Sequence, residues 1–453
     1  MTSALSNLAE DVRKFPGSNP GEPTCDHMKI FADLHIHSKY ARATSDNLTL
    51  ENLEKYGKLK GLNLLGTGDF QHPLWFKELK TNLKEIDNSG FFQFGDKNFF
   101  FLLQTEISNI YDQDGKNRRI HNLILSPNFE VAEQIIDYLN PKANLESDGR
   151  PIFKDLNCIE MTENLMKISK DIFIIPAHAW TPWYGVFGSK TGFDSLEECF
   201  KDQKKHIFAI ETGLSSDPAM NWRFSSLDKI SFVSNSDCHS PWPWRLGREL
   251  NAFELSHPSY KNLIEAIKSK DNSKFLFTIE VDPNYGKYHW DGHRVCGVCL
   301  EPKEAIKYNN VCPVCRRKLT VGVLHRIEEL ADREEGFTPK NYIPFMSVLP
   351  LSELIATVNN TQVFSKSVWE MHNKLTNEFI SEMNILLEIE KVKLIDIAGD
   401  RLADLIIKNR EGKLKVQPGY DGVYGKVILS GEISRKLPQK RLDSFLSPNN
   451  IDR

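Results

Sequence analysis

The feature that most constrains the fold is an alternation of short apolar runs with amphipathic stretches between residues 29 and 282. Runs such as "KIFADLHIHS", "FFFLLQTEIS" and "DIFIIPAHA" have the length and apolar content of strands, and each ends in a polar or glycine-containing loop. Helical patterns such as "TLENLEKYGKLKG" and "FEVAEQIIDYLN" lie between several of them. The alternation predicts an α/β fold with a parallel sheet or a (β/α) barrel.

Length and composition set the broad class. A chain of 453 residues is too long for one compact core, so we expect two to four domains. The content of 40% hydrophobic and 26% charged residues is typical of a soluble globular protein. Because the sequence has no apolar run of membrane-spanning length and no signal-peptide pattern, we expect a cytoplasmic protein without a membrane partner.

Histidines and carboxylates recur where the predicted strands end. The ends of strands in a (β/α) barrel meet at one face, where such enzymes place their chemistry. Two of the motifs, HxH and DxH, put both side chains on the same side of a strand, so each pair can share one metal. The alternative is ordinary alternation of polar residues on a strand. The candidate ligands are His35, His37, Asp69, His72, Glu106, His121, His178, Asp237 and His239.

This series of motifs resembles the PHP (polymerase and histidinol phosphatase) family, whose members are distorted (β/α)7 barrels that bind up to three divalent metals. The second motif departs from the family, because many members have adjacent Asp and His whereas His72 lies three residues after Asp69. The resemblance implies three ligand sets: His35, His37, Glu106 and Asp237; Glu106, His121 and His178; and Asp69, His72 and His239.

The resemblance also implies a metal-dependent phosphoesterase. Mixed imidazole and carboxylate ligands suit zinc, manganese or iron, and magnesium is suited where carboxylates and phosphate dominate. Two or three such metals hydrolyse phosphoesters by activating a bound water, so no protein nucleophile is expected. The expected catalytic residues are His35, His37, Glu106 and Asp237.

Four cysteines predict a separate metal site. Cys296, Cys299, Cys312 and Cys315 form CxxC, twelve residues, CxxC, a spacing typical of a structural zinc ribbon. Four thiolates close the coordination shell and leave no position for a substrate. The alternative is a chance pairing of reduced cysteines.

The sequence pattern changes after the apolar runs, and these changes suggest five segments. Helical patterns follow the cysteines, and "KVQPGYDGVYGKVIL" reads as a turn-rich loop and strand. The first residues match neither pattern, and Met28 is an alternative start of the protein. The expected segments are a disordered extension (1–27), the PHP barrel (28–283), the zinc ribbon (284–338), a small helical DNA-binding domain (339–430) and a flexible tail (431–453).

Cationic and aromatic residues beside the candidate ligands favour a nucleic-acid substrate. Trp180, Trp183, Tyr184, Trp242 and Trp244 can stack bases, although core or loop packing is the commoner use of such residues. Residues 408–441 contain nine Lys or Arg against three Asp or Glu, which suits a polyanion or a solvated basic face. The candidate phosphate contacts are Lys39, Arg42, Arg245, Arg248, Arg316, Arg317, Lys318, Lys413 and Lys415.

The tail carries a short linear motif. Gln439, Leu442, Phe445 and Leu446 fit Qxx(L/I/M)xx(F/Y)(F/Y/L). This spacing resembles the motif by which archaeal and eukaryotic replication and repair proteins bind the sliding clamp PCNA, so we expect a clamp partner and an archaeal source. The alternative is a tail that packs on its own protein.

The order of these parts resembles the endonuclease Q family over residues 28 to 446. The resemblance implies a nucleoid-associated DNA repair endonuclease that cuts 5′ to deaminated bases (uracil, hypoxanthine, xanthine) or abasic sites in double- or single-stranded DNA. Two other functions fit part of the sequence. One is a PHP phosphatase acting on a small phosphomonoester, and the other is a non-catalytic DNA-binding adaptor with structural metals.

Overall fold

The computed structural model describes residues 27–428 and contains a mixed sheet of 11 strands. The spatial order of its main path is β15-β12-β11-β1-β2-β5-β4-β3. Three further strands leave this path, because β6 and β7 pair with β5, and β8 pairs with β6. These strands are β1 (Met28–Asp33), β2 (Leu64–Gly66), β3 (Lys84–Glu85), β4 (Phe92–Gln93), β5 (Phe100–Gln113), β6 (Lys116–Ser126), β7 (Ile152–Lys154), β8 (Phe173–Pro176), β11 (Leu250–Leu255), β12 (Phe275–Glu280) and β15 (Phe345–Ser347).

The first strand, β1, lies between β2 and the much later strand β11. β1, β2 and β5 are parallel, whereas β6 is antiparallel to both β5 and β8. A separate parallel pair, β9 (Ala209–Glu211) and β10 (Ser231–Val233), is linked to these strands by single bridges. Ile174 bridges Ile207 beside β8, and Ile36 bridges Cys238 beyond β1. The predicted α/β class is confirmed, with a mixed rather than purely parallel set of strands.

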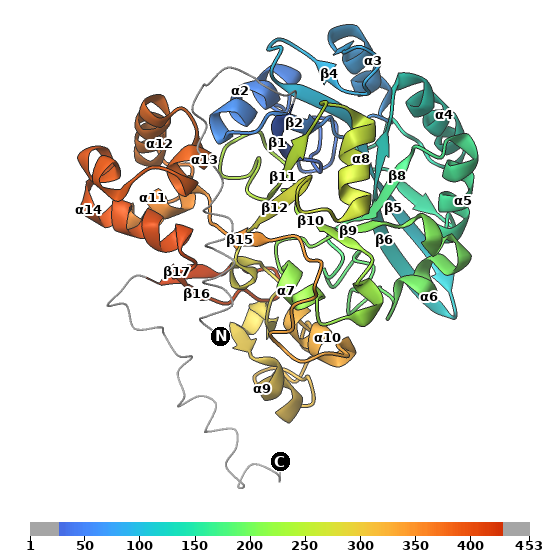
Figure 1. Cartoon of the computed structure of the whole chain (residues 1–453). Helices are drawn as coiled ribbons and strands as arrows, with labels where there is room; N and C mark the ends of the chain where they lie inside the picture. The colour runs from blue at the N-terminus through green and yellow to red at the C-terminus, as the bar shows by residue number, and fades with distance from the viewer. Residues whose placement is uncertain (1–26, 429–453) are drawn as a thin grey trace, which may run out of the picture.

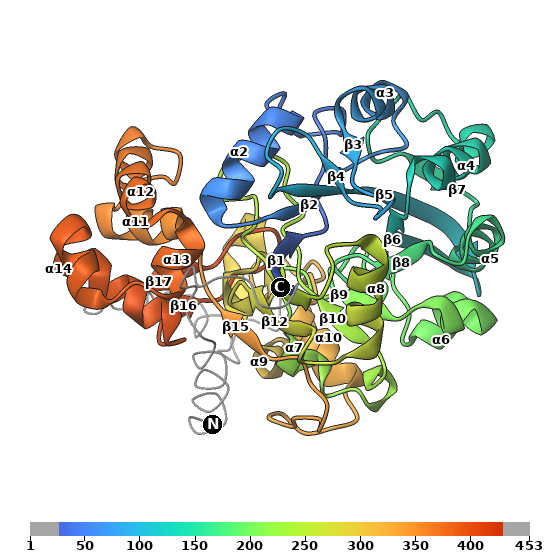
Figure 2. The same cartoon turned by 45° about the horizontal axis from the view of Figure 1, so that its top comes forward.

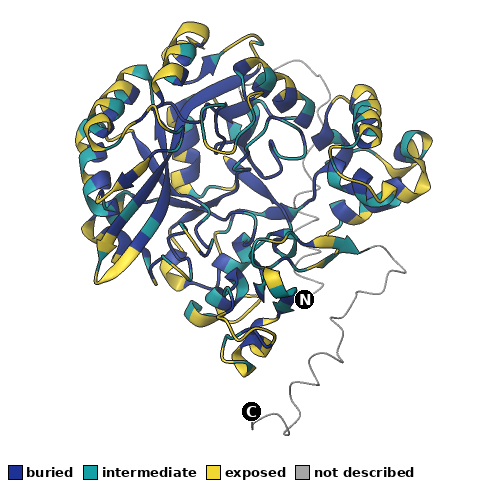
Figure 3. Cartoon of the chain, turned by 180° about the vertical axis from the view of Figure 1, so that it is seen from behind, coloured by how far each residue is buried: buried dark blue, intermediate teal, exposed yellow. Residues whose placement is uncertain are grey.

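Helices cover the outside of these strands (Figures 1 and 2). In α4, for example, the buried face consists of Ala132, Ile135 and Leu139, and the Asn128 side chain caps the first turn by accepting from Val131 N–H. Seen from behind, the strands are buried while the outer helix faces are exposed (Figure 3). These helices are α2 (Leu50–Lys60), α3 (Pro73–Asn82), α4 (Phe129–Leu139), α5 (Cys158–Ile168), α6 (Leu196–Phe200), α7 (Pro218–Asn221) and α8 (Tyr260–Ser269).

Four helices form a group beside α2 (Figure 1). The sequence predicts one helical pattern over residues 366–389, but the chain breaks at Ile380, whose φ is 73°, and Ser381 caps the next helix. Gly399, with φ 75° and ψ 163°, divides the last helix into two arms. The four helices are α11 (Leu351–Asn359), α12 (Lys366–Phe379), α13 (Glu382–Leu387) and α14 (Lys391–Arg410).

The cysteine-rich segment has an apolar cluster of its own, made by Val298, Leu300, Ala305, Cys312 and Leu319. It surrounds a hairpin of β13 (Asp291–His293) and β14 (Val298–Leu300) and the short helix α9 (Pro302–Lys307), and it is followed by α10 (Val323–Leu330). This segment lies at the lower edge of the molecule in Figure 1.

The "PGYDGVYG" stretch is the loop of a second hairpin, β16 (Lys415–Gln417) and β17 (Lys426–Ile428). The loop lies against residues 284–290, because Gly419 N–H donates to Asn284 O (2.8 Å) and Gly425 N–H donates to Tyr285 O (3.0 Å). A Cβ on Gly419 would lie 2.3 Å from Gly286 O, so this approach requires glycine. The loop is therefore docked next to the chain that leaves β12.

Within residues 27–428, no helix combines the length and the apolar character that crossing a membrane requires. The predicted extension, apart from His27, and the predicted clamp motif lie outside the described residues.

Candidate metal centre and cavity

Seven of the nine candidate ligands come together in three overlapping groups. Within each group, the ligand atoms all lie within 4.8 Å of one another. His35 and His37 follow β1 and His178 follows β8, whereas Glu106 and His121 lie within the long strands β5 and β6. The groups are His35, His37 and Glu106; His37, Asp237 and His239; and Glu106, His121 and His178.

Glu106, on β5, turns its two carboxylate oxygens toward two different groups. Oε2 lies 3.3 Å from His37 Nε2 and 3.8 Å from His35 Nε2. Oε1 lies 2.7 Å from His121 Nδ1 and 3.2 Å from His178 Nε2. One buried carboxylate thus faces both groups, which is the placement a carboxylate needs to bridge two cations.

Three buried atoms of these groups make no hydrogen bond with any described residue: His35 Nε2, His37 Nε2 and Asp237 Oδ1. They face one another, since Asp237 Oδ1 lies 3.6 Å from His35 Nε2 and 3.2 Å from His37 Nε2. The Nδ1 atoms of the two rings contact Glu211 and Asp69 instead. Buried polar atoms normally have a partner, and imidazole nitrogens beside carboxylate oxygens form a donor set that fits a divalent cation.

The charges of the centre compensate one another. Burial alone would raise the pKa of Glu106 and Asp237, but interactions with His121 and Arg150 for Glu106, and with His35 and His239 for Asp237, hold both values well below the ordinary range. Burial lowers the pKa of His121 to about 4, so its ring is neutral at neutral pH. The centre therefore offers ionised carboxylates, which are the form that binds a cation.

The structure does not assemble the third predicted ligand set. Asp69 Oδ1 lies 3.0 Å from His37 Nδ1, and Oδ2 accepts hydrogen bonds from the backbone and hydroxyl of Ser38. His72 is the N-cap residue of α3, and its ring stacks on Tyr40 with 4.4 Å between centroids. Its spacing of three residues after Asp69 places it at the start of a helix instead of beside that carboxylate. Of this set, only His239 joins a group.

Three residues at the centre have left-handed backbone. The φ values are 42° for Asp69, 31° for His178 and 46° for Asp237. Side-chain-bearing residues rarely adopt this region, and such strain is concentrated at functional sites. Glycine accommodates one of these turns, because a Cβ on Gly213 would lie 2.8 Å from His178 Cβ.

A cavity of about 710 Å³ opens at the metal groups. Its wall contains His121, His178, Asp237 and His239. The lining also includes cations and aromatic rings, namely Arg42, Arg150, Trp183, Tyr184, Arg245, Arg248, Lys287, Tyr288 and Tyr424. Tyr424 comes from the docked "PGYDGVYG" loop, so a segment near the end of the described chain forms part of this wall.

Several predicted DNA contacts lie elsewhere. The Lys39 ammonium binds Glu78 at 2.9 Å, and Lys39 does not line the cavity. Trp180 is buried, and Trp242 and Trp244 pack against Trp369 of α12, so these rings serve packing. Five further cations are exposed on the cysteine-rich segment and after α14: Arg316, Arg317, Lys318, Lys413 and Lys415.

Sequence reasoning missed two residues of the centre. Glu211 ends the short strand β9 and contacts His35, so the rule that placed the other ligands at strand ends applied to it as well. Arg150 Nη1 lies 3.1 Å from Glu106 Oε2, but it comes from the loop before β7, where no periodic pattern points to it.

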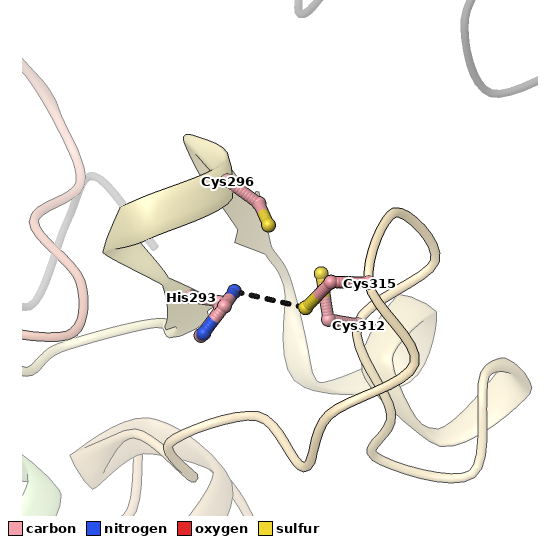
Figure 4. A group of neighbouring side chains, drawn as sticks. All are labelled: His293, Cys296, Cys312 and Cys315. Atoms are coloured by element: carbon pink, nitrogen blue, oxygen red, sulfur yellow. Dashed lines mark hydrogen bonds between the residues drawn. The ribbon is translucent and has the colours of Figure 1, made fainter.

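The cysteine-rich segment places His293 where the sequence predicted Cys299. Cys296, Cys312, Cys315 and His293 form a group with ligand atoms within 4.8 Å, and Cys315 Sγ lies 3.4 Å from His293 Nδ1 (Figure 4). Side chains alternate along β14, so Cys299 faces away from the buried Val298 and Leu300, and its Sγ contacts Pro418 O at 3.9 Å.

Relatives cover most of the chain. The protein YqxK of Bacillus subtilis, whose function is uncharacterized, is 30% identical over 416 residues, which is 88% of this chain and 99% of YqxK. The uncharacterized protein MJ0043 of Methanocaldococcus jannaschii is 33% identical over 255 residues, but the match spans only 31% of MJ0043. Residues 350–413, which include α11–α14, match the family model of the MJ0043 C-terminal domain.

Two solved structures are also similar. The lesion-specific endonuclease PfuEndoQ from Pyrococcus furiosus has a TM-score of 0.79 and 34% identity, covering 92% of this chain and 99% of that one. Endonuclease Q in complex with a 27-mer duplex carrying an abasic lesion at the active site has a TM-score of 0.80 and 34% identity, covering 91% and 100%. The chain therefore belongs to the endonuclease Q family.

Proposed function

We propose that this protein is a metal-dependent DNA repair endonuclease that hydrolyses the phosphodiester 5′ to a deaminated base or an abasic site. The observation that carries the proposal is the convergence of seven buried or half-buried ligands at a cavity lined by cations and aromatic rings. Membership of the endonuclease Q family supports it, since a relative binds a duplex with an abasic lesion at its active site.

The two groups that share Glu106 fit divalent cations best. We assign His35, His37 and Glu106 to one cation, with Asp237 and His239 beside this group. We assign Glu106, His121 and His178 to another cation. Bound there, such cations supply an activated water and neutralise charge on the phosphate oxygens. Glu106 fixes the separation of the two groups because it contacts both.

The cations of the cavity wall are suited to hold the phosphates on either side of the scissile bond. Arg150 extends from its loop to within 3.1 Å of Glu106 Oε2, so its guanidinium lies at the centre itself. Backbone contacts hold that loop, since Gly149 N–H donates to Tyr40 O at 2.9 Å and Gln71 Nε2 donates to Gly149 O at 2.6 Å. A guanidinium held in this way can contact two phosphate oxygens at once.

The aromatic residues of the same wall suit an extruded nucleotide. Trp183, Tyr184, Tyr288 and Tyr424 line the cavity beside the predicted ligands. Deaminated and abasic sites pair weakly, so moving such a nucleotide out of the duplex costs less than moving a normal one. Selection of damage would begin with this difference.

We also propose a role for each part of the chain. The strands and helices of residues 28–283 form the PHP barrel, the cysteine-rich segment of 284–338 forms a zinc module, and residues 339–430 form a DNA-binding domain. The exposed cations at 316–318, 413 and 415 support duplex contacts away from the cavity. Association with the nucleoid would follow from DNA binding.

A nuclease assay tests the proposed function. Metal-loaded protein is incubated with duplexes carrying uracil, hypoxanthine or an abasic site, with an undamaged duplex, and with histidinol phosphate. We expect cuts 5′ to the lesions that stop after chelator treatment. Hydrolysis of histidinol phosphate without DNA incision would identify the alternative phosphatase, and DNA binding without either reaction would identify the adaptor.

The zinc module gives a second testable assignment. Replacing His293 by alanine is expected to reduce zinc bound per chain, because it removes one of four atoms that close a tetrahedral shell. Cys299→Ser is the matched control and should retain zinc. Elemental analysis after loading the barrel with manganese measures both. Zinc retained in His293→Ala and lost in Cys299→Ser would restore the four-cysteine set.

The tail motif supports a sliding clamp as partner. Gln439, Leu442, Phe445 and Leu446 would present the apolar anchors. Phe445→Ala is expected to weaken binding to a PCNA-type clamp in calorimetry while incision without clamp stays unchanged. Equal binding by the variant and the parent protein would refute this partner.

A further inference from the structure

Glu211 lies at the end of β9, beneath the metal groups, and is 1% exposed. Both of its oxygens lie 3.0 Å from His35 Nδ1. Oε2 accepts a hydrogen bond from the backbone N–H of His178 at 2.7 Å, and Oε1 accepts one from Asn235 Nδ2 at 2.8 Å. The carboxylate is thus fully engaged, with two of its three partners belonging to predicted metal ligands.

The contact with His35 determines which ring nitrogen is available. A carboxylate accepts but does not donate when ionised, so the Nδ1 atom that faces Glu211 carries the proton. A cation at the centre would then meet the Nε2 lone pair, which lies 3.8 Å from Glu106 Oε2 and 3.6 Å from Asp237 Oδ1. Carboxylate contacts of this kind orient histidine ligands and increase their basicity.

Glu211 also contacts His178, which belongs to the group of Glu106, His121 and His178. The His178 backbone has φ 31°, and Glu211 holds this unusual turn from both sides: the side chain accepts from His178 N–H, and the Glu211 carbonyl accepts from Ala179 N–H at 2.9 Å. Glu211 therefore fixes the ring of His35 in one group that shares Glu106 and the backbone of His178 in the other.

Asp69 occupies the corresponding position behind the other ring of the HxH pair. Its Oδ1 lies 3.0 Å from His37 Nδ1, and Ser38 holds its Oδ2. Each histidine of the pair therefore has one buried carboxylate at Nδ1 and turns Nε2 toward Glu106 and Asp237. The repetition of this contact on two neighbouring ligands argues against a chance ion pair at Glu211.

We propose that Glu211 is a positioning residue of the metal centre, which sets the ring orientation of His35 and the backbone of His178 so that both groups can bind a divalent cation. The inference rests on the proposed function, because it requires that these groups hold cations. It assigns Asp69 the same role toward His37 in place of the ligand role predicted from the sequence.

Manganese binding without DNA tests the inference. Glu211→Gln keeps the size of the side chain but places an amide NH2 against one of the donors, so Mn²⁺ affinity is expected to fall about 10- to 100-fold. Isothermal titration with Mn²⁺ measures it, and thiolate sites that prefer zinc do not compete. Glu280→Gln is the matched control, because Glu280 is as buried and bonds to Thr278, Thr212 and Ser234 but contacts no ligand.

The outcomes separate the inference from the proposed function. Weak Mn²⁺ binding by Glu211→Gln with normal binding by Glu280→Gln supports the positioning role. Normal binding by Glu211→Gln while Asp237→Ala loses the metal overturns the role and leaves the nuclease proposal intact. Normal binding by Asp237→Ala as well overturns both. If Glu211→Gln does not fold, Glu211→Asp, which is one methylene too short to reach both partners, must give the same loss of affinity.

Discussion

Replacing Glu106 by alanine is expected to lower single-turnover incision of an abasic-site duplex by on the order of 10³-fold. The carboxylate is buried and faces both ligand groups, so its loss removes one ligand from each. It also leaves the Arg150 guanidinium, 3.1 Å away in the parent protein, without its buried counter-ion. Because one oxygen faces each group, no other described residue can replace it.

Glu163→Ala is the matched control for this variant. Glu163 is a half-exposed carboxylate on α5 that pairs with Lys167 one turn away, so its loss should leave incision unchanged. Metal content measured in parallel should fall in Glu106→Ala alone. Incision by Glu106→Ala within a few-fold of the parent would exclude a catalytic metal pair that shares this carboxylate.

The second large effect is expected on stability. Replacing Lys60 by methionine should lower the free energy of unfolding by about 3–5 kcal/mol, because it removes one partner of a fully buried ion pair. Lys60 Nζ on α2 binds Glu382 Oε1 on α13 at 2.7 Å, and both side chains are 0% exposed. Glu382 also accepts from Leu351 N–H and lies 2.9 Å from His372 Nε2. The pair is thus a buried polar contact between the strand-rich part and the helical group.

Urea unfolding of the variant measures this loss, and Lys366→Met is the matched control. Lys366 forms a surface pair with Glu370 and is 90% exposed, so its replacement should change stability by less than about 0.5 kcal/mol. The double variant Lys60→Met with Glu382→Leu should recover part of the loss, since an apolar pair leaves no buried charge. A loss below about 1 kcal/mol for Lys60→Met would mean that Glu382 finds another counter-ion.

The Glu382 carboxylate also makes the stability of the fold depend on pH. Burial alone would raise the pKa of Glu382, but Lys60 and His372 lower it to about 2. The unfolded value is about 4.3, so the unfolded state binds the proton first and the pair stabilises the fold fully above that pH. The stabilisation is lost as the pH falls through about 2, and Lys60→Met should lack this acid-sensitive part of the unfolding profile.

The sequence predicted the α/β class and placed candidate ligands in or just after apolar runs, because both follow from apolar periodicity. His35, His37, Glu106 and Asp237 were placed by that rule, and the structure brings them together. Two other candidates depend on local geometry. His72 begins a helix, and Cys299, which was predicted from the CxxC spacing, lies on the opposite face of a strand from the apolar cluster.

Other parts of the centre leave no periodic signal at all. Arg150 reaches Glu106 from a loop that is fixed by contacts with residues more than 70 positions away, such as Gln71. Tyr424 enters the cavity because glycines allow its loop to approach residues 284–286. Such placements depend on the tertiary fold, which a single sequence does not display.

The docked loop also determines at which stage of protein synthesis the cavity can be complete. A ribosome makes the candidate metal ligands first, since the last of them is His239, whereas Tyr424 is added almost two hundred residues later. Until that loop has emerged and packed against residues 284–290, the cavity lacks one wall. The cavity can therefore be completed only after the helical group has been synthesised, and a chain terminated before Tyr424 would carry the candidate ligands without the finished cavity.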